Sequence, residues 1–572
     1  MYIIGIDLGT TNSLAAVWRN GKAELIPNAL GEYLTPSVVS LDENGTVLVG
    51  RAARDRLISH PERTASCFKR DMGTDRTYNL GGRRFTPEEL SSLVLRQLRE
   101  DAEAYLGEPV TEAVVSVPAY FAEAQRSATK RAGALAGLTV DRLVNEPSAA
   151  AVSAHIGDGD ADKVCLVFDF GGGTLDVSLV ERFENVVSVT AVSGDNHLGG
   201  RDFDLAIVQG FCGDTGLDYE KLTPQQRELL LRQAESCKIA LTTQKSVLML
   251  YNREDSPPLS AELTNEWLIR KSAALFKRMT DPIRRVLMDS GTPPSGLDEL
   301  VMVGGSSRMP AVRGYVSRTL DKDPASNSRP DTAIALGAGI CAGMKARSQD
   351  LRELVLTDVC PFTLGVDIYN AADPGKSLMS PIIERNSILP SSKVRSYCTI
   401  RDNQTVVETN IFQGENRYTK DNTLLGSLKI HVPAAPKGEQ KINIRFTYDI
   451  NGILEVDVIS QTDTGHLLLK EGAVSDLEAR RRMKELSALK LHPRDQEQNR
   501  AIIARGERLY AATVGNMRYS VGEMLDWFQQ QLSSQEPLRI AKAAQRAEAY
   551  FDRIEEFMDG AGLPDPEDWE GL

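Results

Sequence analysis

Two short segments of the sequence combine an aspartate with a glycine turn in the same order. They are residues 5–13 (GIDLGTTNS) and residues 167–176 (VFDFGGGTLD). Each has an apolar run, an Asp, one apolar residue and then Gly and Thr, and a second apolar run follows. This order predicts a strand, a tight turn and an antiparallel strand. Glycines let backbone N–H groups approach phosphate oxygens, and Thr and Asn side chains add donors. The two segments therefore predict two halves of one phosphate-binding site.

Each segment also places a carboxylate at the end of its first strand, Asp7 in one and Asp169 in the other. Such carboxylates can hold a hydrated cation against phosphate groups. A Walker-type loop is excluded, because it needs a Lys-Ser/Thr pair followed by a helix. The alternative for each segment is a structural turn capped by its Asp. The matching order of the two segments favours a nucleotide site.

Composition and charge indicate a soluble globular protein of several domains. A chain of 572 residues exceeds one core and suggests roughly three to five domains. The net charge of −13 argues against a nucleic-acid binder. Seven scattered cysteines without a C-x-x-C pair favour reduced thiols in a cytoplasmic protein over a disulfide or zinc framework. Asp7 interrupts the N-terminal apolar stretch, so we expect a core strand there, with no signal peptide and no membrane span.

Residues 1–350 alternate strand-like and helix-like stretches, as in an α/β domain. Strands are expected at 113–117 and 300–303, and helices after Thr86 and Thr223, each of which precedes a Pro and a Glu or Gln in a capping pattern. The two Asp segments stand about 160 residues apart and each opens a similar region. We therefore expect a duplicated, two-lobed domain with nucleotide in the cleft between the lobes.

The remaining sequence changes character twice. A short connector at 351–358 precedes short alternating runs at 359–470, where an Asn451-Gly452 turn predicts a hairpin in a β-sandwich. From 475 to 558 the pattern is helical, opened by a capping box at 475–478 and broken near Pro493, Gly515 and Pro537. Residues 559–572 are expected to form a frayed tail.

The ordered motifs of the chain resemble those of the DnaK-like seventy-kilodalton heat-shock chaperones. They are IDLGTTNS at 6–13, VPAYF at 117–121, NEPSAAA at 145–151, FDFGGGTLD at 168–176, HLGGRDFD at 197–204, VGGSSRMP at 303–310 and the connector. Within the family the chain looks most like the short, divergent bacterial HscC branch. That narrower resemblance rests on Thr357 in the connector, the CPFTLGV stretch at 360–366 and the short chain.

The resemblance implies a multidomain protein: an α/β actin-like (ribonuclease-H-like, duplicated) ATPase domain, a β-sandwich peptide-binding domain and a C-terminal α-helical lid. It implies an ATP-dependent chaperone that binds unfolded or extended peptide loosely with ATP and tightly with ADP. The implied cofactors are ATP or ADP, Mg²⁺ and K⁺. The implied partners are peptide clients and a J-domain co-chaperone, while the exchange factor is left open.

The resemblance also assigns the nucleotide site. Lys69, by itself an unremarkable surface lysine, becomes a catalytic residue at the γ-phosphate, as phosphoryl transfer needs positioned charge. Glu146 opens a predicted helix, so it either pairs with the helix N-terminus or acts in catalysis. The implied catalytic residues are Lys69, Glu146, Asp169 and Thr174, and Thr174 and Asp176 resemble the pair that contacts water and ions in the family. The implied Mg²⁺ carboxylates are Asp7 and Asp169. The implied phosphate contacts are Gly9, Thr10, Thr11, Asn12, Gly171, Gly172 and Gly173.

The adenosine pocket is implied by three further stretches. Glycines after the strand at 300–303 leave bare backbone for a base or ribose, and Arg308 can stack on adenine. Glu235, Lys238 and Thr242 share one face of an expected helix, either as an intrahelical salt bridge or as a pocket wall. The implied pocket residues are Glu235, Lys238, Thr242, Gly304, Gly305, Ser306, Arg308 and Asp331.

Signal transmission and peptide binding are assigned by resemblance alone. The interdomain set is Pro118, Arg126, Arg142 (a J-domain contact), Leu354, Val355, Leu356 and Asp358. Thr357 replaces a leucine that is usual in the family, so we expect weaker docking of the connector. The peptide groove is assigned to Val366, Tyr369, Tyr397, Ile400, Val407 and Thr409. Their bulk and hydroxyl groups predict a narrower range of peptides.

Two other functions share the expected two-lobed fold. A small-molecule kinase would need a substrate cleft with a catalytic Asp, and an actin-like filament ATPase would assemble with nucleotide. Neither explains residues 359–572, which favours the chaperone.

Overall fold

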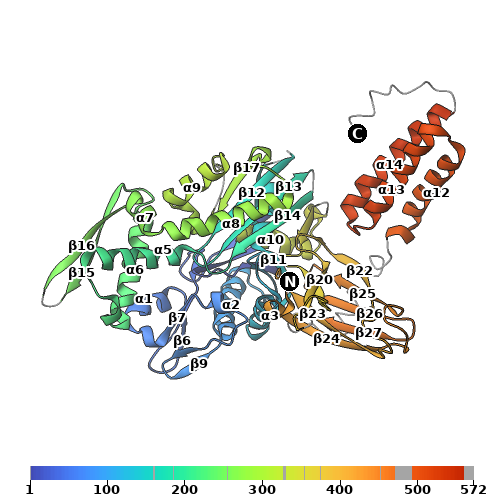
Figure 1. The fold of residues 1–572 in the computed structure, drawn as a ribbon. Coiled ribbons are helices and arrows are strands. Elements are labelled where there is room, and N and C mark those ends of the chain that lie inside the picture. Colours follow the sequence, from blue (N-terminus) through green and yellow to red (C-terminus); the bar gives the residue numbers. More distant parts are fainter. Residues whose placement is uncertain are drawn as a thin grey trace. The chain divides into compact units, whose positions relative to one another are not determined.

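The computed structural model describes residues 2–158, 162–183, 186–253, 256–325, 330–352, 354–373, 375–450, 452–469 and 493–558. These residues divide into two compact units, with unit 1 reaching to Phe362 and unit 2 starting at Thr363. The described part of the predicted connector, 351–358, therefore lies in unit 1. Figure 1 shows the strands and helices of both units.

The first lobe of unit 1 is built on a mixed sheet. Its order is β11-β10-β1-β2-β3, with β1 parallel to β10, β10 parallel to β11, and β1, β2 and β3 joined as antiparallel neighbours. The bounds are β1 (Ile3–Asp7), β2 (Asn12–Arg19), β3 (Lys22–Ile26), β10 (Glu112–Val117) and β11 (Thr139–Asn145). The first Asp segment therefore forms the predicted hairpin.

The second lobe repeats this arrangement. Its strands run in the order β17-β12-β13-β14, with β12 parallel to β17 and with β12, β13 and β14 joined as antiparallel neighbours. The bounds are β12 (Lys163–Phe170), β13 (Leu175–Phe183), β14 (Val186–Asp195) and β17 (Glu299–Val303). Because β12–β13 takes the place of β1–β2, the second Asp segment is also a hairpin, and the duplication expected from the sequence is present in the sheet order.

Helices cover the two sheets. Thr86 and Glu89 form the predicted capping box of α2, and Thr223 and Gln226 form that of α6. At the centre, Gly337 of α10 lies so close to Ala149 of α4 that an added Cβ would stand 1.8 Å from the Ala149 carbonyl oxygen. The helices are α1 (Arg51–Ser59), α2 (Pro87–Leu106), α3 (Glu123–Leu135), α4 (Glu146–Asp158), α5 (Gly200–Thr215), α6 (Pro224–Ala240), α7 (Asn265–Lys271), α8 (Ala273–Ser290), α9 (Pro310–Leu320) and α10 (Ala333–Lys345).

Each lobe has its own apolar core. Ile4, Ile6 and Val115 are fully buried in the first lobe, while Phe168 and Phe170 are fully buried in the second. Small sheets extend the lobes: β4 (Thr35–Pro36), β5 (Val38–Leu41), β6 (Val47–Val49), β7 (Thr64–Ser66), β8 (Tyr78–Leu80) and β9 (Arg83–Phe85) in the first, and the projecting hairpin of β15 (Ser246–Arg253) and β16 (Ser256–Thr264) in the second (Figure 1).

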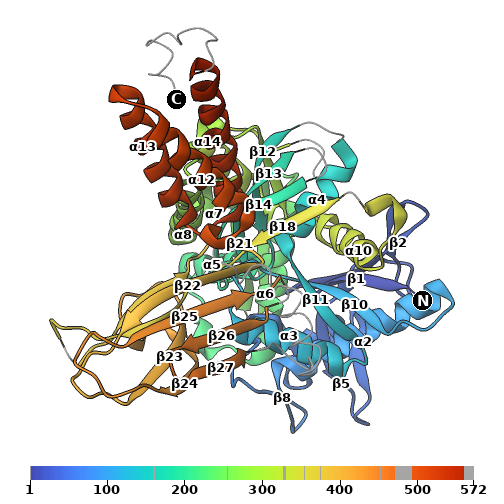
Figure 2. The same cartoon turned by 90° about the vertical axis from the view of Figure 1, so that its right-hand side faces the viewer.

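Unit 2 contains two antiparallel sheets. Buried residues alternate with more exposed ones along their strands, as the alternating sequence predicts. One has the order β20-β19-β23-β24 and the other β22-β25-β26-β27, whose strands lie side by side in Figure 2. The expected hairpin is formed by β25 and β26, although Asn451 of its turn lies outside the described residues. The bounds are β19 (Leu364–Ile368), β20 (Leu378–Ile383), β21 (Ile388–Leu389), β22 (Ser391–Cys398), β23 (Val406–Gln413), β24 (Thr423–His431), β25 (Lys441–Tyr448), β26 (Leu454–Ile459) and β27 (Thr464–Leu469).

The C-terminal described residues form the expected helices. They are α12 (Glu497–Ala512), α13 (Gly515–Leu532) and α14 (Pro537–Met558), which pack as a bundle around Leu509, Phe528 and Phe551 (Figure 1). The breaks fall where Gly515 and Pro537 predict them. The capping box expected at 475–478 and the tail at 559–572 lie outside the described residues.

None of the seven cysteines forms a disulfide, and five of them are buried. Within the described ranges, no helix combines the length and apolar character that a membrane crossing requires.

Candidate functional site

The two glycine turns meet across one cavity of about 520 Å³ between the lobes of unit 1. The turn after β1 contacts the turn after β12 directly: an added Cβ would lie 1.9 Å from the Thr11 hydroxyl at Gly172, and 2.5 Å from a Thr10 carbon at Gly173. Only glycine fits at Gly172 and Gly173 without displacement. The two halves predicted from the sequence are therefore adjacent, and residues of both turns line one cavity.

Almost all of the nucleotide-site residues expected from the sequence line this cavity. Gly173, packed behind the rim against Thr10, is the exception among the phosphate contacts. The lining residues from that set are Asp7, Gly9, Thr10, Thr11, Asn12, Lys69, Glu146, Asp169, Gly171, Gly172, Thr174, Glu235, Lys238, Thr242, Gly304, Gly305, Ser306, Arg308 and Asp331.

Lys69 and Glu146 form a buried ion pair at the cavity floor. The Lys69 Nζ lies 2.6 Å from the Glu146 Oε1, and both side chains are less than a tenth exposed. Glu146 begins α4 directly after β11, as expected, so the end of a buried strand aims its carboxylate inward. Lys69 lies in a short 3₁₀ turn, Phe68–Asp71, with its ammonium 5.7 Å from the Phe121 ring centre. The local sequence around Lys69 does not predict this burial.

Three further carboxylates crowd this pair. Burial raises the pKa of Asp7 to about 7, and the Glu146 carboxylate raises it too, while Lys69 and a hydrogen bond from Ser116 lower it. Burial, followed by Glu146, raises the pKa of Asp176 to about 7. Burial and then the neighbouring Glu146, Asp176 and Asp7 raise the pKa of Asp169 well above its ordinary value. One lysine thus faces four buried carboxylates.

This cluster fits a divalent cation. The Oδ2 atoms of Asp169 and Asp176 are buried and have no hydrogen-bond partner among the described residues. Carboxylate oxygens are the ligands that Mg²⁺ prefers, and a doubly charged ion would offset their repulsion. The strand ends predicted to hold Mg²⁺, Asp7 and Asp169, therefore have the chemistry that the ion requires.

The adenosine side of the cavity corrects one expectation. Glu235 and Lys238 do not pair with each other: Glu235 pairs with Arg54 of α1 at 3.0 Å, and Lys238 pairs with Asp204 of α5 at 2.7 Å. The intrahelical salt bridge is therefore wrong, because longer-range partners outcompete the neighbour on the same helix face. Thr242 also lies beyond the end of α6, in the following turn.

On the opposite wall, Gly304 adopts a left-handed backbone with φ of 81°. An added Cβ there would stand 2.5 Å from the Phe170 carbonyl oxygen, so the turn after β17 requires glycine. Arg308 and Asp331, assigned separately to this pocket, form an ion pair.

Several lining residues were not singled out from the sequence. Asp204 lies in the quoted 197–204 motif, and burial raises its pKa to about 6 although Lys238 lowers it. Outside the lining of this cavity, Arg70 pairs with Asp202 at 2.8 Å, and this pair and Arg54–Glu235 both join the two lobes. Only the motif around Asp204 carried a sequence signal; the arginine partners depend on contacts between distant segments.

A hydrogen-bonded chain joins Arg126 to the connector through Asn145, the residue that precedes Glu146. Arg126 donates to the Asn145 Oδ1 at 2.5 Å, and the Asn145 Nδ2 donates to the Asp358 Oδ2 at 2.7 Å. The Ser148 hydroxyl donates to the same Asp358 oxygen at 3.0 Å. Asn145 directly precedes Glu146. Arg126 and Asp358, expected to act together, are therefore joined through a residue next to the ion pair.

The two other relay residues lie near this chain. Pro118 follows β10 and its carbonyl accepts from the Phe121 N–H at 3.1 Å, in the turn that Arg126 also contacts. Arg142 lies on β11, half-buried, beside Val114 of β10.

The connector forms a strand, β18 (Val355–Val359), which pairs in parallel with β14. Val355 stays 47% exposed, whereas Leu354 and Leu356 are half-buried. Thr357 replaces the apolar contact of a leucine with a polar one, because its hydroxyl lies 2.8 Å from that of Ser188 on β14. The expectation of uniformly weaker docking therefore overlooked a polar contact that the sequence does not display.

The residues assigned to the peptide groove all belong to unit 2. Val366 and Thr409 are buried, Val407 is half-buried, and Tyr369 and Ile400 are 48% and 39% exposed. The Tyr397 hydroxyl donates to the Ser380 Oγ at 3.0 Å. Tyr397 therefore has a partner without peptide, and its hydroxyl adds less polarity than we expected from the sequence.

Comparison with known proteins agrees with these features. The family described as Hsp70 protein matches residues 3–557. The chain is 39% identical over 475 residues to a protein named "Chaperone protein DnaK" from Thermotoga petrophila, a match that covers 80% of this chain and 78% of that protein.

The chain belongs to the Hsp70 family. The family resemblance inferred from the motifs is thereby confirmed. The protein is an ATP-dependent chaperone with ATPase activity, and the actin-fold kinase is not favoured. The HscC branch stays a prediction from the connector and the chain length.

Proposed function

We propose that this protein hydrolyses ATP in the cavity between the lobes of unit 1 and uses the nucleotide state to control peptide binding in unit 2. One observation carries the proposal: the Lys69–Glu146 pair in the cavity adjoins Asn145, which binds Asp358 of the connector. A displacement of Glu146 would reach the connector through the backbone of Asn145 and then through its side-chain amide.

The residues take distinct roles in this proposal. Asp7 and Asp169 hold Mg²⁺, which neutralises phosphate charge, and the two glycine turns bind phosphate oxygens through N–H groups. Lys69 orients the terminal phosphate, while Glu146 and Thr174 position the attacking water. Burial of Lys69 and Glu146 at the phosphate end strengthens these charge interactions.

The adenosine end is assigned to a second group. Arg308 stacks on the base, and Glu235 and Lys238 bind the ribose from α6, with Thr242, Gly304, Gly305, Ser306 and Asp331 completing the wall. K⁺ is a further proposed cofactor, which rests on the resemblance alone.

The two units are proposed to be an actin-like ATPase domain, and a peptide-binding sandwich with a helical lid. The domain boundaries at 350, 358, 470 and 475 follow from the sequence pattern. The proposed partners are extended peptides and a J-domain co-chaperone that uses Arg142, and the proposed location is the cytoplasm, in keeping with seven cysteines that form no disulfide.

Steady-state ATP hydrolysis tests this function. Purified protein is assayed alone, with an isolated J-domain, and with J-domain plus an extended apolar peptide. We expect slow basal turnover that both additions raise. Turnover that neither addition changes, together with phosphorylation of a small molecule in a substrate screen, would support the kinase alternative instead.

A further inference from the structure

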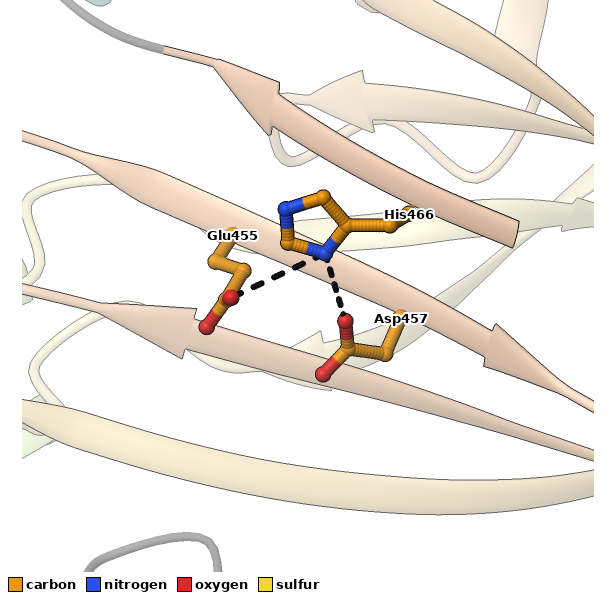
Figure 3. Close-up of side chains that lie close together, drawn as sticks. All are labelled: Glu455, Asp457 and His466. Carbon is orange, nitrogen blue, oxygen red and sulfur yellow. Dashed lines mark hydrogen bonds and ion pairs between the residues drawn. The ribbon is translucent and has the colours of Figure 1, made fainter. Parts of the chain in front are cut away.

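Three side chains of types that can bind metals lie close together within unit 2, and the lining of the unit 1 cavity does not include them. They are Glu455 and Asp457 of β26 and His466 of β27 (Figure 3). Residues 455 and 457 are two apart on one strand and so share one face of the sheet. Asp457 stands directly opposite His466 in the antiparallel register. The strand pairing alone therefore brings all three to one face.

The donor atoms are already close together. The His466 Nδ1 lies 2.9 Å from the Asp457 Oδ1 and 3.7 Å from the Glu455 Oε1, and the donor atoms all lie within 4.8 Å of one another. Ligands bound to Zn²⁺ at about 2.0–2.2 Å in a tetrahedron stand roughly 3.4 Å apart. The observed spacings bracket this value, so small side-chain rotations suffice to surround an ion.

The three side chains differ in burial: the two carboxylates are largely buried, and the imidazole is open to solvent. The Glu455 side chain is 8% exposed and that of Asp457 is 14% exposed, whereas the His466 side chain is 46% exposed. Three protein ligands with one side open to solvent leave room for water as a further ligand, as in zinc sites with an open position.

The donor set indicates which metals fit. Ca²⁺ and Mg²⁺ favour sites made of oxygen alone, and thiolate-seeking ions need Cys. One imidazole and two carboxylates suit a divalent transition ion such as Zn²⁺. β25 pairs with β26 on the edge away from β27, and its Arg445 stands directly opposite Asp457. The positive charge of Arg445 moderates the affinity of the three-residue group for a cation.

We propose that Glu455, Asp457 and His466 form a binding site for a divalent transition-metal ion, with Zn²⁺ as its representative. In the metal-free protein the Nδ1–H of His466 donates to Asp457, and the ion takes the place of that proton. Bound metal joins β26 to β27, the last described strand before the helices. It therefore stabilises unit 2 independently of nucleotide.

A second histidine, in the other sheet of unit 2, provides a matched control. His431 of β24 has its Nδ1 3.7 Å from the Asp463 Oδ2, a contact with one carboxylate that forms no such three-residue group within the described ranges. His431→Ala removes an exposed imidazole from unit 2 without touching the proposed ligands.

The test is calorimetric titration of the metal-free full chain with ZnCl₂. Mg²⁺ and ADP are present throughout, so that the carboxylates of the nucleotide site are occupied, and the seven cysteines contribute equally to every variant. We expect wild type and His431→Ala to bind one more Zn²⁺ per chain than His466→Ala. Asp457→Asn, which keeps the shape of the side chain, should weaken that extra binding at least tenfold.

Thermal unfolding gives an independent readout, because an ion that binds only the folded state raises its stability. Zn²⁺ should raise the melting temperature of unit 2 in wild type and His431→Ala, and by less in His466→Ala and Asp457→Asn. Equal Zn²⁺ uptake by wild type and both ligand variants would overturn the site. A loss of uptake in His431→Ala as large as that in His466→Ala would also overturn it.

Discussion

The side-chain amide of Asn145 donates a 2.7 Å hydrogen bond to the carboxylate of Asp358. Asn145 is the neighbour of Glu146, whose carboxylate holds Lys69 in the nucleotide cavity, and Asp358 belongs to the connector strand β18. Two functional segments that are 213 residues apart thus meet through one amide. This contact gives the coupling of hydrolysis to peptide binding a specific location.

Asp358→Ala should uncouple the two activities. The substitution leaves the donors of Asn145 and Ser148 without their acceptor, while the cavity itself is unchanged. We expect basal ATP hydrolysis within about twofold of wild type, with the ATP-triggered release of a fluorescent peptide slowed at least tenfold. Asp350→Ala, just before the connector in the 3₁₀ turn Gln349–Leu351, serves as the control. Wild-type release kinetics in Asp358→Ala would contradict the coupling role.

Lys69→Ala should abolish ATP hydrolysis while the protein still binds ATP. Many other groups line the cavity, so we expect ATP affinity within roughly tenfold of wild type, about 1.4 kcal/mol. Single-turnover hydrolysis and competition with a fluorescent nucleotide measure the two effects. Because removal of one partner leaves the buried Glu146 carboxylate unpaired, the melting temperature of Lys69→Ala is compared with that of wild type to check that the loss is not caused by unfolding. Wild-type single-turnover rates in Lys69→Ala would exclude the catalytic assignment.

The raised carboxyl pKa values predict a pH dependence of the nucleotide-free protein. Asp7 and Asp176 have pKa values of about 7 when folded and 3.8 ordinarily, so the folded state binds more protons between these values. Their contribution to stability is present below about pH 4 and is lost as pH rises toward 7. Asp176→Asn should flatten this fall in melting temperature. An unchanged pH profile would show that Asp176 is not perturbed.

The raised pKa values of these carboxyl groups make metal binding stronger, and not weaker, as the pH rises. Mg²⁺ competes with protons for Asp7 and Asp169, so the affinity for Mg²⁺ with ADP should rise with pH through about 7. Calorimetry between pH 5.5 and 8.5 measures this rise, with Lys163→Ala as a surface control. A pH-independent affinity would contradict the raised pKa values.

The connector prediction changes once Ser188 is known as the partner of Thr357. Thr357→Val keeps the side-chain shape and removes the hydroxyl, which should weaken docking of β18 by about 0.5–1.5 kcal/mol. Protease protection of the connector with ATP bound measures the docked population. Ser188→Ala and the double variant Thr357→Val/Ser188→Ala complete a double-mutant cycle. Additive effects of the two substitutions on docking would exclude a direct interaction between the two hydroxyl groups.

The sequence predicted those features that depend on local pattern. Both glycine hairpins, the capped starts of α2 and α6, and Glu146 at a strand-to-helix junction followed from short-range rules of turn and cap chemistry. It could not predict the partners of Glu235, Lys238 and Thr357. Arg54, Asp204 and Ser188 are brought to them by packing between distant segments, which no local pattern encodes. The Glu455–Asp457–His466 group was missed for a related reason, since it depends on the register between β26 and β27.

The groove prediction also becomes sharper. Ser380 already binds the Tyr397 hydroxyl, whereas Ile400 is 39% exposed and adds bulk where the family usually has a small residue. Ile400→Ala should tighten binding of Leu-rich peptides in ADP about threefold to tenfold, whereas Tyr397→Phe should change it little. Fluorescence anisotropy with apolar and mixed peptides measures both. Tight wild-type binding that Ile400→Ala does not improve would exclude a restricted groove.

The central claim is that nucleotide in unit 1 controls peptide affinity in unit 2, and stopped-flow release of a labelled peptide from the ADP-bound protein tests it most directly. Mixing with Mg²⁺ and ATP should accelerate release of the peptide at least tenfold over mixing with Mg²⁺ and ADP. Lys69→Ala, which binds ATP without hydrolysing it, should show the same acceleration. Release at one rate with either nucleotide, from a protein that demonstrably binds both, would contradict the account.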